Sequence, residues 1–274
     1  TLCAAFEHAF GFDHAIVGGV ITIATLLIIF GGVQRIAKVS SIIVPVMALG
    51  YIALALIIVA INITELPAVI KLIVSHAFGW QQALGGGVGI ALMQGIKRGL
   101  FSNEAGMGST PHAHARAVVK NPHCQGLAAM ISVFIDTFIV LNLTVFSILT
   151  TNSLSSGKDG IMLTQYAFST VFGSFGDIFI AVCLLFFAFS TILGWHFFGS
   201  INVKHLFGKK GMVPYSVLVA VFIVVGSMLK VDLVWTLADF FNGLMVIPNA
   251  LALLALSGVV ASICKKYSSE KSDN

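Results

Sequence analysis

The stretch Ala83–Ala115, ALGGGVGIALMQGIKRGLFSNEAGMGSTPHAHA, joins a glycine-rich apolar segment directly to a polar one. Its first part has the length of a membrane crossing, since a bilayer core needs ~20 helical residues. Glycine weakens a helix and exposes backbone groups that can bind a cation or a carboxylate. We therefore predict a helix break near residues 94–107, whereas the glycines of Gly85–Gly89 serve tight helix packing.

The composition of the whole chain is that of an integral membrane protein. It is 58% hydrophobic and 9% charged, whereas soluble domains are about 45–50% apolar and about 25% charged. The last apolar segment contains Pro248 and is interpreted as one bent crossing. Seven crossings are predicted: Ala15–Val33, Ser41–Ile61, Ala83–Leu100, Leu127–Thr151, Asp177–Phe198, Val213–Leu229 and Leu233–Ile263.

The basic residues indicate how these crossings are oriented, because Lys and Arg concentrate in cytoplasmic loops. Seven crossings leave Lys71, Lys158 and Lys230 on one side of the membrane. We therefore predict an external N-terminus, a cytoplasmic C-terminus and a multi-pass protein of the plasma membrane, the inner membrane in bacteria. The other side receives twelve cations: Arg35, Lys38, Lys97, Arg98, Arg116, Lys120, Lys204, Lys209, Lys210, Lys265, Lys266 and Lys271.

Two segments lie outside these crossings. Residues 63–82 are apolar but short for a span, and predict an external helix at the interface with Trp80 as its anchor. Residues 265–274 form a polar cytoplasmic tail. The four cysteines show no CxxC pairing, so we expect neither disulfides nor zinc.

No enzymatic or nucleic-acid-binding motif is present. GxSxG, P-loop and HExxH patterns are missing from the sequence, and no basic, aromatic-interleaved patch indicates nucleic acid. His112 and His114 are two residues apart and would point to different helix faces, which disfavours a zinc site. We expect no catalytic residue, no cofactor and no resident metal.

Several polar side chains in the apolar segments allow two interpretations each. Glu104 is either an ion partner at membrane depth or a structural carboxylate paired with Lys97 or Arg98. Asp136 is either a functional ion partner or a buried acid bonded to neighbouring hydroxyl groups or to a base outside this sequence. Asp239 forms a polar sector with Thr236 and Asn242, either as a satisfied network or facing a substrate.

The segment KRGLFSNEAGMGSTPHAHA, residues 97–115, resembles the signature of the alanine/glycine:cation symporter family. AFSTILGWHFFG at 188–199 and KVDLVWTLADFFNGLMVIPN at 230–249 are similar to the same family. The resemblance covers the chain from about residue 31 onward. It implies an all-α membrane protein with the leucine-transporter-type architecture of two inverted five-helix repeats, in which the third crossing is a broken helix.

Within that architecture, the resemblance makes residues 1–62 the last two helices of the first repeat and residues 83–264 the second repeat. It also implies a second broken helix in a part that would precede Thr1. The expectation is therefore a fragment that lacks the N-terminal half of the carrier and cannot transport by itself.

The resemblance further implies a sodium-coupled symporter of alanine or glycine that works by alternating access, with sodium as coupling ion and the lipid bilayer as its setting. A passive channel or a non-transporting membrane fragment is the alternative. Phe187, Ser190 and Thr191 match the sodium ligands of the fold, although membrane hydroxyls often bond to carbonyls one turn earlier. The implied substrate residues are Gln94, Phe101, Ser102, Asn103, Gly106, Thr191 and Trp195, and the gating or charge-pair residues are Lys97, Arg98 and Glu104.

Overall fold

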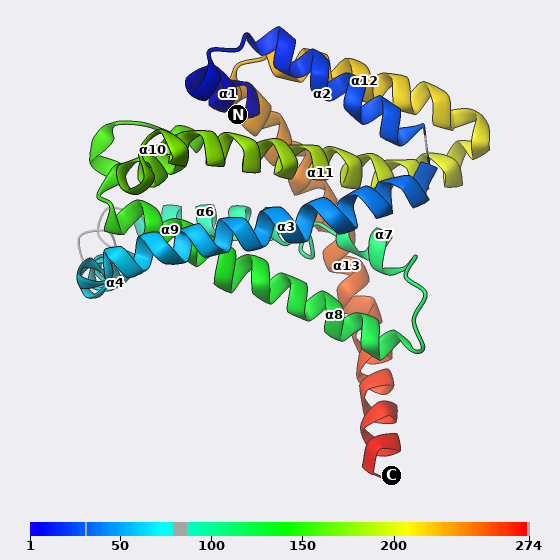
Figure 1. The fold of residues 1–274 in the computed structure, drawn as a ribbon. Coiled ribbons are helices and arrows are strands. Elements are labelled where there is room, and N and C mark those ends of the chain that lie inside the picture. Colours follow the sequence, from blue (N-terminus) through cyan, green and yellow to red (C-terminus); the bar gives the residue numbers. More distant parts are fainter. Residues whose placement is uncertain (31, 79–86, 273–274) are drawn as a thin grey trace. The chain divides into compact units, whose positions relative to one another are not determined.

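The computed structural model describes residues 1–30, 32–78 and 87–272 (Figure 1). These residues form helices joined by turns, and no strand occurs among them. The chain divides into two compact units. Unit 1 comprises Thr1–Ser75 and Asn142–Val234, and unit 2 comprises His76–Leu141 and Trp235–Asn274.

Unit 1 is built around one long helix, α11 (Ser174–Phe207), with α3 (Gly32–Ile61) lying beside it (Figure 1). A second pair, α2 (His14–Ile29) and α12 (Met212–Met228), also lies side by side. The short helix α1 (Leu2–Phe10) packs on α11. The remaining elements are η1 (Ile63–Glu65), α4 (Leu66–Phe78), α9 (Leu141–Thr150), η3 (Ser153–Ser156), α10 (Ile161–Phe172) and η4 (Gly208–Gly211).

The core of unit 1 combines apolar contacts with close helix approach. Ile29, Ile36 and Leu193 bring α2, α3 and α11 together. Between α10 and α11, a Cβ on Gly176 would lie 2.5 Å from the backbone oxygen of Phe168. Small residues that let backbones approach closely are typical of membrane helix packing.

Unit 2 contains the broken helix and the two helices that contact it. Helix α6 (Gly87–Ser102) is followed by an irregular segment and the short helix α7 (Thr110–His114). Helix α8 (Pro122–Phe134) passes into a π-helical turn, η2 (Ile135–Val140). Helix α13 (Val231–Ser272) continues past Pro248 without interruption.

Four stretches are long and apolar enough to cross a membrane: Gln34–Ile61, Pro122–Thr150, Ser174–Met228 and Val231–Tyr267. The multi-pass membrane character predicted from the composition is therefore supported. The stretch Ser174–Met228 contains α11, η4 and α12, and α2 is a shorter apolar helix. Each of the seven predicted crossings is mostly helical where it is described, while their number stays a prediction.

Some predicted features fall outside the described residues, namely the Trp80 anchor and the start of the third crossing at Ala83. The predicted external segment contains α4. The break itself begins later than predicted: residues 94–102 are helical, and the irregular segment starts at Asn103. Gly95 and Gly99 do not interrupt α6, because a helix accommodates isolated glycines when no competing hydrogen bond replaces its own.

Candidate functional site

Helix α6 ends because Asn103 and Glu104 give the backbone a different set of hydrogen bonds. The Asn103 side chain accepts a hydrogen bond from the Ala105 amide at 3.1 Å, which is a local turn that competes with helix. Glu104 has a φ of 55°, an uncommon conformation for a residue other than glycine. Such strain occurs most often at functional sites.

Further hydrogen bonds close the irregular segment on itself. The hydroxyl of Ser109 donates to the Glu104 carboxylate at 2.9 Å, and the hydroxyl of Thr110 donates to the Asn103 carbonyl at 3.2 Å. Ser109 is 1% exposed. Residues 103–109, which we call the break segment, therefore form an ordered turn between α6 and α7.

Asn249 of α13 contacts the break segment from one side. Its amide nitrogen donates to the carbonyl oxygens of Ala105 and Gly106, each at 2.9 Å. Gly108 has a φ of 84°, and a Cβ there would lie 2.7 Å from the Asn249 side chain. Asn249 was not among the residues predicted for the site. Its sequence signal is weak: an amide directly after a proline within a long apolar helix.

Asp136 of the π-helical turn η2 contacts the end of α6. Its carboxylate accepts a hydrogen bond of 2.6 Å from the hydroxyl of Ser102. This contact agrees with the interpretation of Asp136 as an acid bonded to a neighbouring hydroxyl. Single π-helical turns inside α-helices occur frequently at functional sites.

The break segment lies at the middle of two long apolar stretches. Asn249 is the central residue of Val231–Tyr267, and Asp136 is the central residue of Pro122–Thr150. Both side chains bond to residues 102–106. The end of α6 and the break segment are therefore contacted by the middle residues of two apolar stretches.

A charged contact lies eight residues before Gly106, between α6 and the first turns of α13. Arg98 forms an ion pair of 3.0 Å with Asp239, and its guanidinium lies 4.8 Å from the centre of the Trp235 ring. Phe101 meets the same ring edge-on, with the centroids 5.8 Å apart. Asp239 is thus the acid that the structure pairs with Arg98, whereas Glu104 bonds to Ser109.

These contacts show in which direction α6 runs relative to α13. Arg98 lies beside Asp239 and Gly106 beside Asn249, so residue numbers increase in the same direction along both helices. The predicted end of the third crossing at Leu100 lies two residues before the end of α6. The assignment of Lys97 and Arg98 to the cytoplasmic side stays a prediction.

The predicted sodium residues lie on α11 in unit 1. The hydroxyl of Ser190 donates to the carbonyl oxygen of Phe187 at 3.0 Å, the local bond that is common for membrane serines. Thr191 is exposed, and half-buried Trp195 meets Phe198 edge-on at 6.0 Å between centroids. Two of the three predicted sodium ligands therefore bond to each other in this structure.

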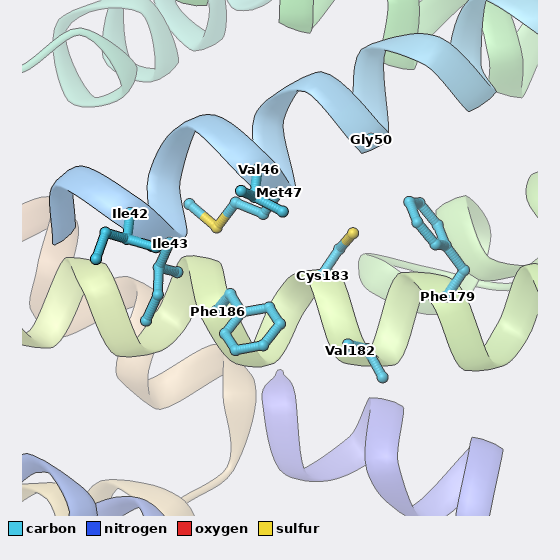
Figure 2. Close-up of a pocket in the computed structure, with 9 residues that line it drawn as sticks. All are labelled: Ile42, Ile43, Val46, Met47, Gly50, Phe179, Val182, Cys183 and Phe186. Atoms are coloured by element: carbon cyan, nitrogen blue, oxygen red, sulfur yellow. The ribbon is translucent and has the colours of Figure 1, made fainter. Parts of the chain in front are cut away.

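A cavity of about 260 Å³ lies between α3 and α11, also in unit 1 (Figure 2). Gly50 and Phe179 contribute to its wall, and every lining residue is apolar apart from the weakly polar thiol of Cys183. A zwitterionic or charged ligand would find no hydrogen-bond partner there. Its lining residues are Ile42, Ile43, Val46, Met47, Gly50, Phe179, Val182, Cys183 and Phe186.

The predicted substrate and gating residues of α6 differ in their surroundings. Phe101, Ser102, Asn103 and Gly106 are half-buried at the break, whereas Gln94 and Lys97 are exposed on α6. Within the described ranges, no group of three or more His, Cys, Asp or Glu side chains is placed to hold a metal ion. The arrangement supplies hydrogen-bonding side chains and backbone carbonyl groups where α6 ends.

Comparison of the sequence with known proteins identifies a transporter family. The model of the sodium:alanine symporter family matches residues 1–274. The probable sodium/glutamine symporter GlnT of Bacillus subtilis is 44% identical over 273 residues, which cover 99% of this chain and 57% of that protein. The amino-acid carrier protein AlsT of the same species is 40% identical, covering 99% and 58%.

An archaeal relative extends the comparison. The sodium/alanine symporter AgcS of Methanococcus maripaludis is 39% identical over 271 residues, covering 97% of this chain and 60% of that protein. The chain thus spans 57% to 60% of the length of these relatives. The family match extends over the whole chain and includes the break segment with both of its partner helices. This chain belongs to the sodium:alanine symporter family.

Proposed function

We propose that this protein carries out sodium-coupled symport of a small neutral amino acid, alanine or glycine, by alternating access. The observation that most directly supports this proposal is that the middle residues of two apolar stretches contact the break segment and the end of α6. Secondary transporters bind substrate near the bilayer midplane, where interrupted helices offer backbone groups as ligands. The proposed substrate contacts are Phe101 and Ser102 at the end of α6 and Asn103 and Gly106 of the break segment.

The proposed architecture is the leucine-transporter type with inverted five-helix repeats. Helices α2 and α3 take the place of the last two helices of the first repeat. The second repeat then consists of α6 with α7, the continuous stretch from α8 to α9, α11, α12 and α13. This assignment puts the C-terminus in the cytoplasm, and the inner membrane is the proposed location in bacteria.

Sodium is the proposed coupling ion, with Phe187, Ser190 and Thr191 of α11 as its ligands. The Ser190 hydroxyl and the Phe187 carbonyl oxygen lie 3.0 Å apart, and each keeps a lone pair that a cation can bind. Hard oxygen ligands suit an alkali cation. A membrane potential supplies about 2.3 kcal/mol per charge per 100 mV to drive the loaded carrier inward.

Substrate size separates alanine from larger neutral amino acids. The name of one relative contains glutamine and the name of another contains alanine. Membership of the family therefore does not select the substrate by itself. Trp195, together with Phe198, is the proposed wall that excludes larger side chains. Replacing Trp195 with Ala should lower the KM for glutamine relative to that for alanine, and an unchanged ratio would remove Trp195 from the site.

The test of the function is uptake into proteoliposomes that contain the full-length gene product. Radiolabelled alanine, glycine and glutamine are supplied with an inward sodium gradient or with choline in its place. Accumulation above equilibrium only with sodium, and saturation with substrate, are expected. Equal accumulation without sodium contradicts sodium coupling, and a current that does not saturate identifies a channel instead.

A further inference from the structure

The break leaves backbone carbonyl groups without their helical partners. In an uninterrupted helix, the oxygens of Ala105 and Gly106 would accept hydrogen bonds from amides four residues later. The backbone bends away at Gly108, whose φ is 84°. Inside a bilayer core, a carbonyl that lacks a donor is costly, because lipid supplies no hydrogen bonds.

The side chain of Asn249 replaces the two missing backbone donors. A primary amide nitrogen carries two hydrogens, and the two distances of 2.9 Å assign one to each carbonyl oxygen. The orientation of the amide follows from this contact: both neighbours are acceptors, so its nitrogen must face them. Few other side chains provide two neutral donors at this length without bringing a charge to mid-depth.

Gly108 makes the approach of Asn249 possible. A Cβ at this position would lie 2.7 Å from both Cγ and Oδ1 of Asn249 and 2.9 Å from its Cβ. These distances are shorter than van der Waals contact, so a side chain on Gly108 would displace the amide. The positive φ of Gly108 and its lack of a side chain therefore serve the same contact.

We propose that Asn249 is the positioning residue of the broken helix: its amide holds the break segment in the conformation that recognises the amino-acid substrate. This inference rests on the proposed transport function. The substrate contacts Asn103 and Gly106 belong to the segment that Asn249 holds, so loss of the amide changes substrate affinity. Asn249 itself acts through the backbone and not on the substrate.

The first experiment compares Asn249→Ala with Asn242→Ala in the full-length gene product. Asn242 is an amide on the same helix, and the described residues give it no hydrogen bond to the break segment. Loss of two hydrogen bonds worth about 1 kcal/mol each corresponds to a KM for alanine raised roughly tenfold or more. Vmax per folded transporter changes less. A KM within twofold of wild type in Asn249→Ala overturns the inference.

The second experiment uses pH to restore a donor. Asn249→Asp keeps the shape of the side chain, but an ionised carboxylate has no hydrogen to donate. Lowering the pH from about 7 to about 5 protonates part of the carboxyl groups and should lower the KM of this variant. Wild type and Asn242→Asp, which share Glu104 and every other titratable group near the break, serve as references. An equal pH response in all three proteins contradicts the proposal.

The third experiment does not depend on transport. Hydrogen–deuterium exchange of the purified protein should become faster in residues 103–110 of Asn249→Ala and of Gly108→Ala, but not of Asn242→Ala. Each of the two changes, Gly108→Ala and Asn249→Ala, removes the same contact. The exchange rate of the double variant should therefore not exceed that of the faster single variant by more than about twofold. Unchanged exchange in Asn249→Ala overturns the inference, whereas absence of sodium-driven uptake in wild type overturns only the function.

Discussion

Asp136 and Ser102 show how a single polar contact can join two membrane helices. The 2.6 Å hydrogen bond fixes the last residue of α6 against the π-helical turn η2. A carboxylate within an apolar stretch is costly unless it is satisfied. Ser102 is the neighbour that satisfies it, so the contact both stabilises the acid and orients the start of the break segment.

Removing either partner should have the same consequence. A hydrogen bond to a charged group contributes about 1.5–3 kcal/mol, so Ser102→Ala and Asp136→Ala should each lower Vmax/KM roughly tenfold. The double variant should lose little more, and Ser132→Ala on α8, whose hydroxyl bonds only to a local carbonyl, is the control. Additive losses in uptake kinetics would show that the two residues act separately.

Arg98 and Asp239 make a second contact at residue scale, which is weaker. Their side chains are 44% and 29% exposed, and a partly exposed ion pair that water reaches contributes about 0–1 kcal/mol. We expect Asp239→Asn to reduce uptake at most about fivefold. The double variant Arg98→Asp, Asp239→Arg, which exchanges the two charges, should recover part of the uptake that Asp239→Asn loses.

Arg98→Lys separates the ion pair from the aromatic contact. Lysine keeps the charge but lacks the planar guanidinium that lies over the Trp235 ring. Uptake by Arg98→Lys should therefore lie between wild type and Arg98→Ala. Full activity of the lysine variant would show that the charge alone matters.

At the scale of elements, α10 and α11 depend on the absence of a side chain at Gly176. A Cβ there meets backbone atoms of Phe168 and Ser169, at 2.5 to 2.8 Å. Backbone cannot rotate aside as a flexible side chain can. The two helices therefore have to separate to accommodate any residue larger than glycine.

Gly176→Ala should destabilise the protein by about 1–3 kcal/mol, the usual cost of overpacking. Gly194→Ala is the matched control, because a Cβ at Gly194 of the same helix α11 meets no neighbour within 4 Å. Thermal unfolding in detergent measures the difference. Equal unfolding temperatures for both variants would contradict the close approach of α10 and α11.

At the scale of the whole molecule, the four cysteines test burial and topology together. Cys3 and Cys183 are buried, while Cys124 and Cys264 are exposed. Burial raises the pKa of the Cys3 thiol, which reduces its reactive thiolate fraction at neutral pH. The reaction of Cys3 with a maleimide should therefore accelerate at a higher pH than the reaction of an ordinary thiol, whose pKa is lower.

Sidedness follows from the predicted orientation. A membrane-impermeant maleimide should label Cys124 and Cys264 in inverted vesicles and not in right-side-out vesicles. Variants that retain one cysteine at a time assign each signal. Labelling of Cys264 from the outside would reverse the C-terminus and overturn the topology derived from the basic residues.

The sequence by itself determined the membrane character, the helical class, the family and the existence of a break after the glycine-rich segment. These features depend on composition and on residues close together along the chain. Local hydrogen bonds of Asn103 and Glu104 set where the break begins, and only the tertiary structure decided what holds it. Asn249 lies 144 and 143 residues from Ala105 and Gly106, and Arg98 lies 141 residues from Asp239. Apolar periodicity carries no information about partners so distant, because the packing of helices selects which side chains meet.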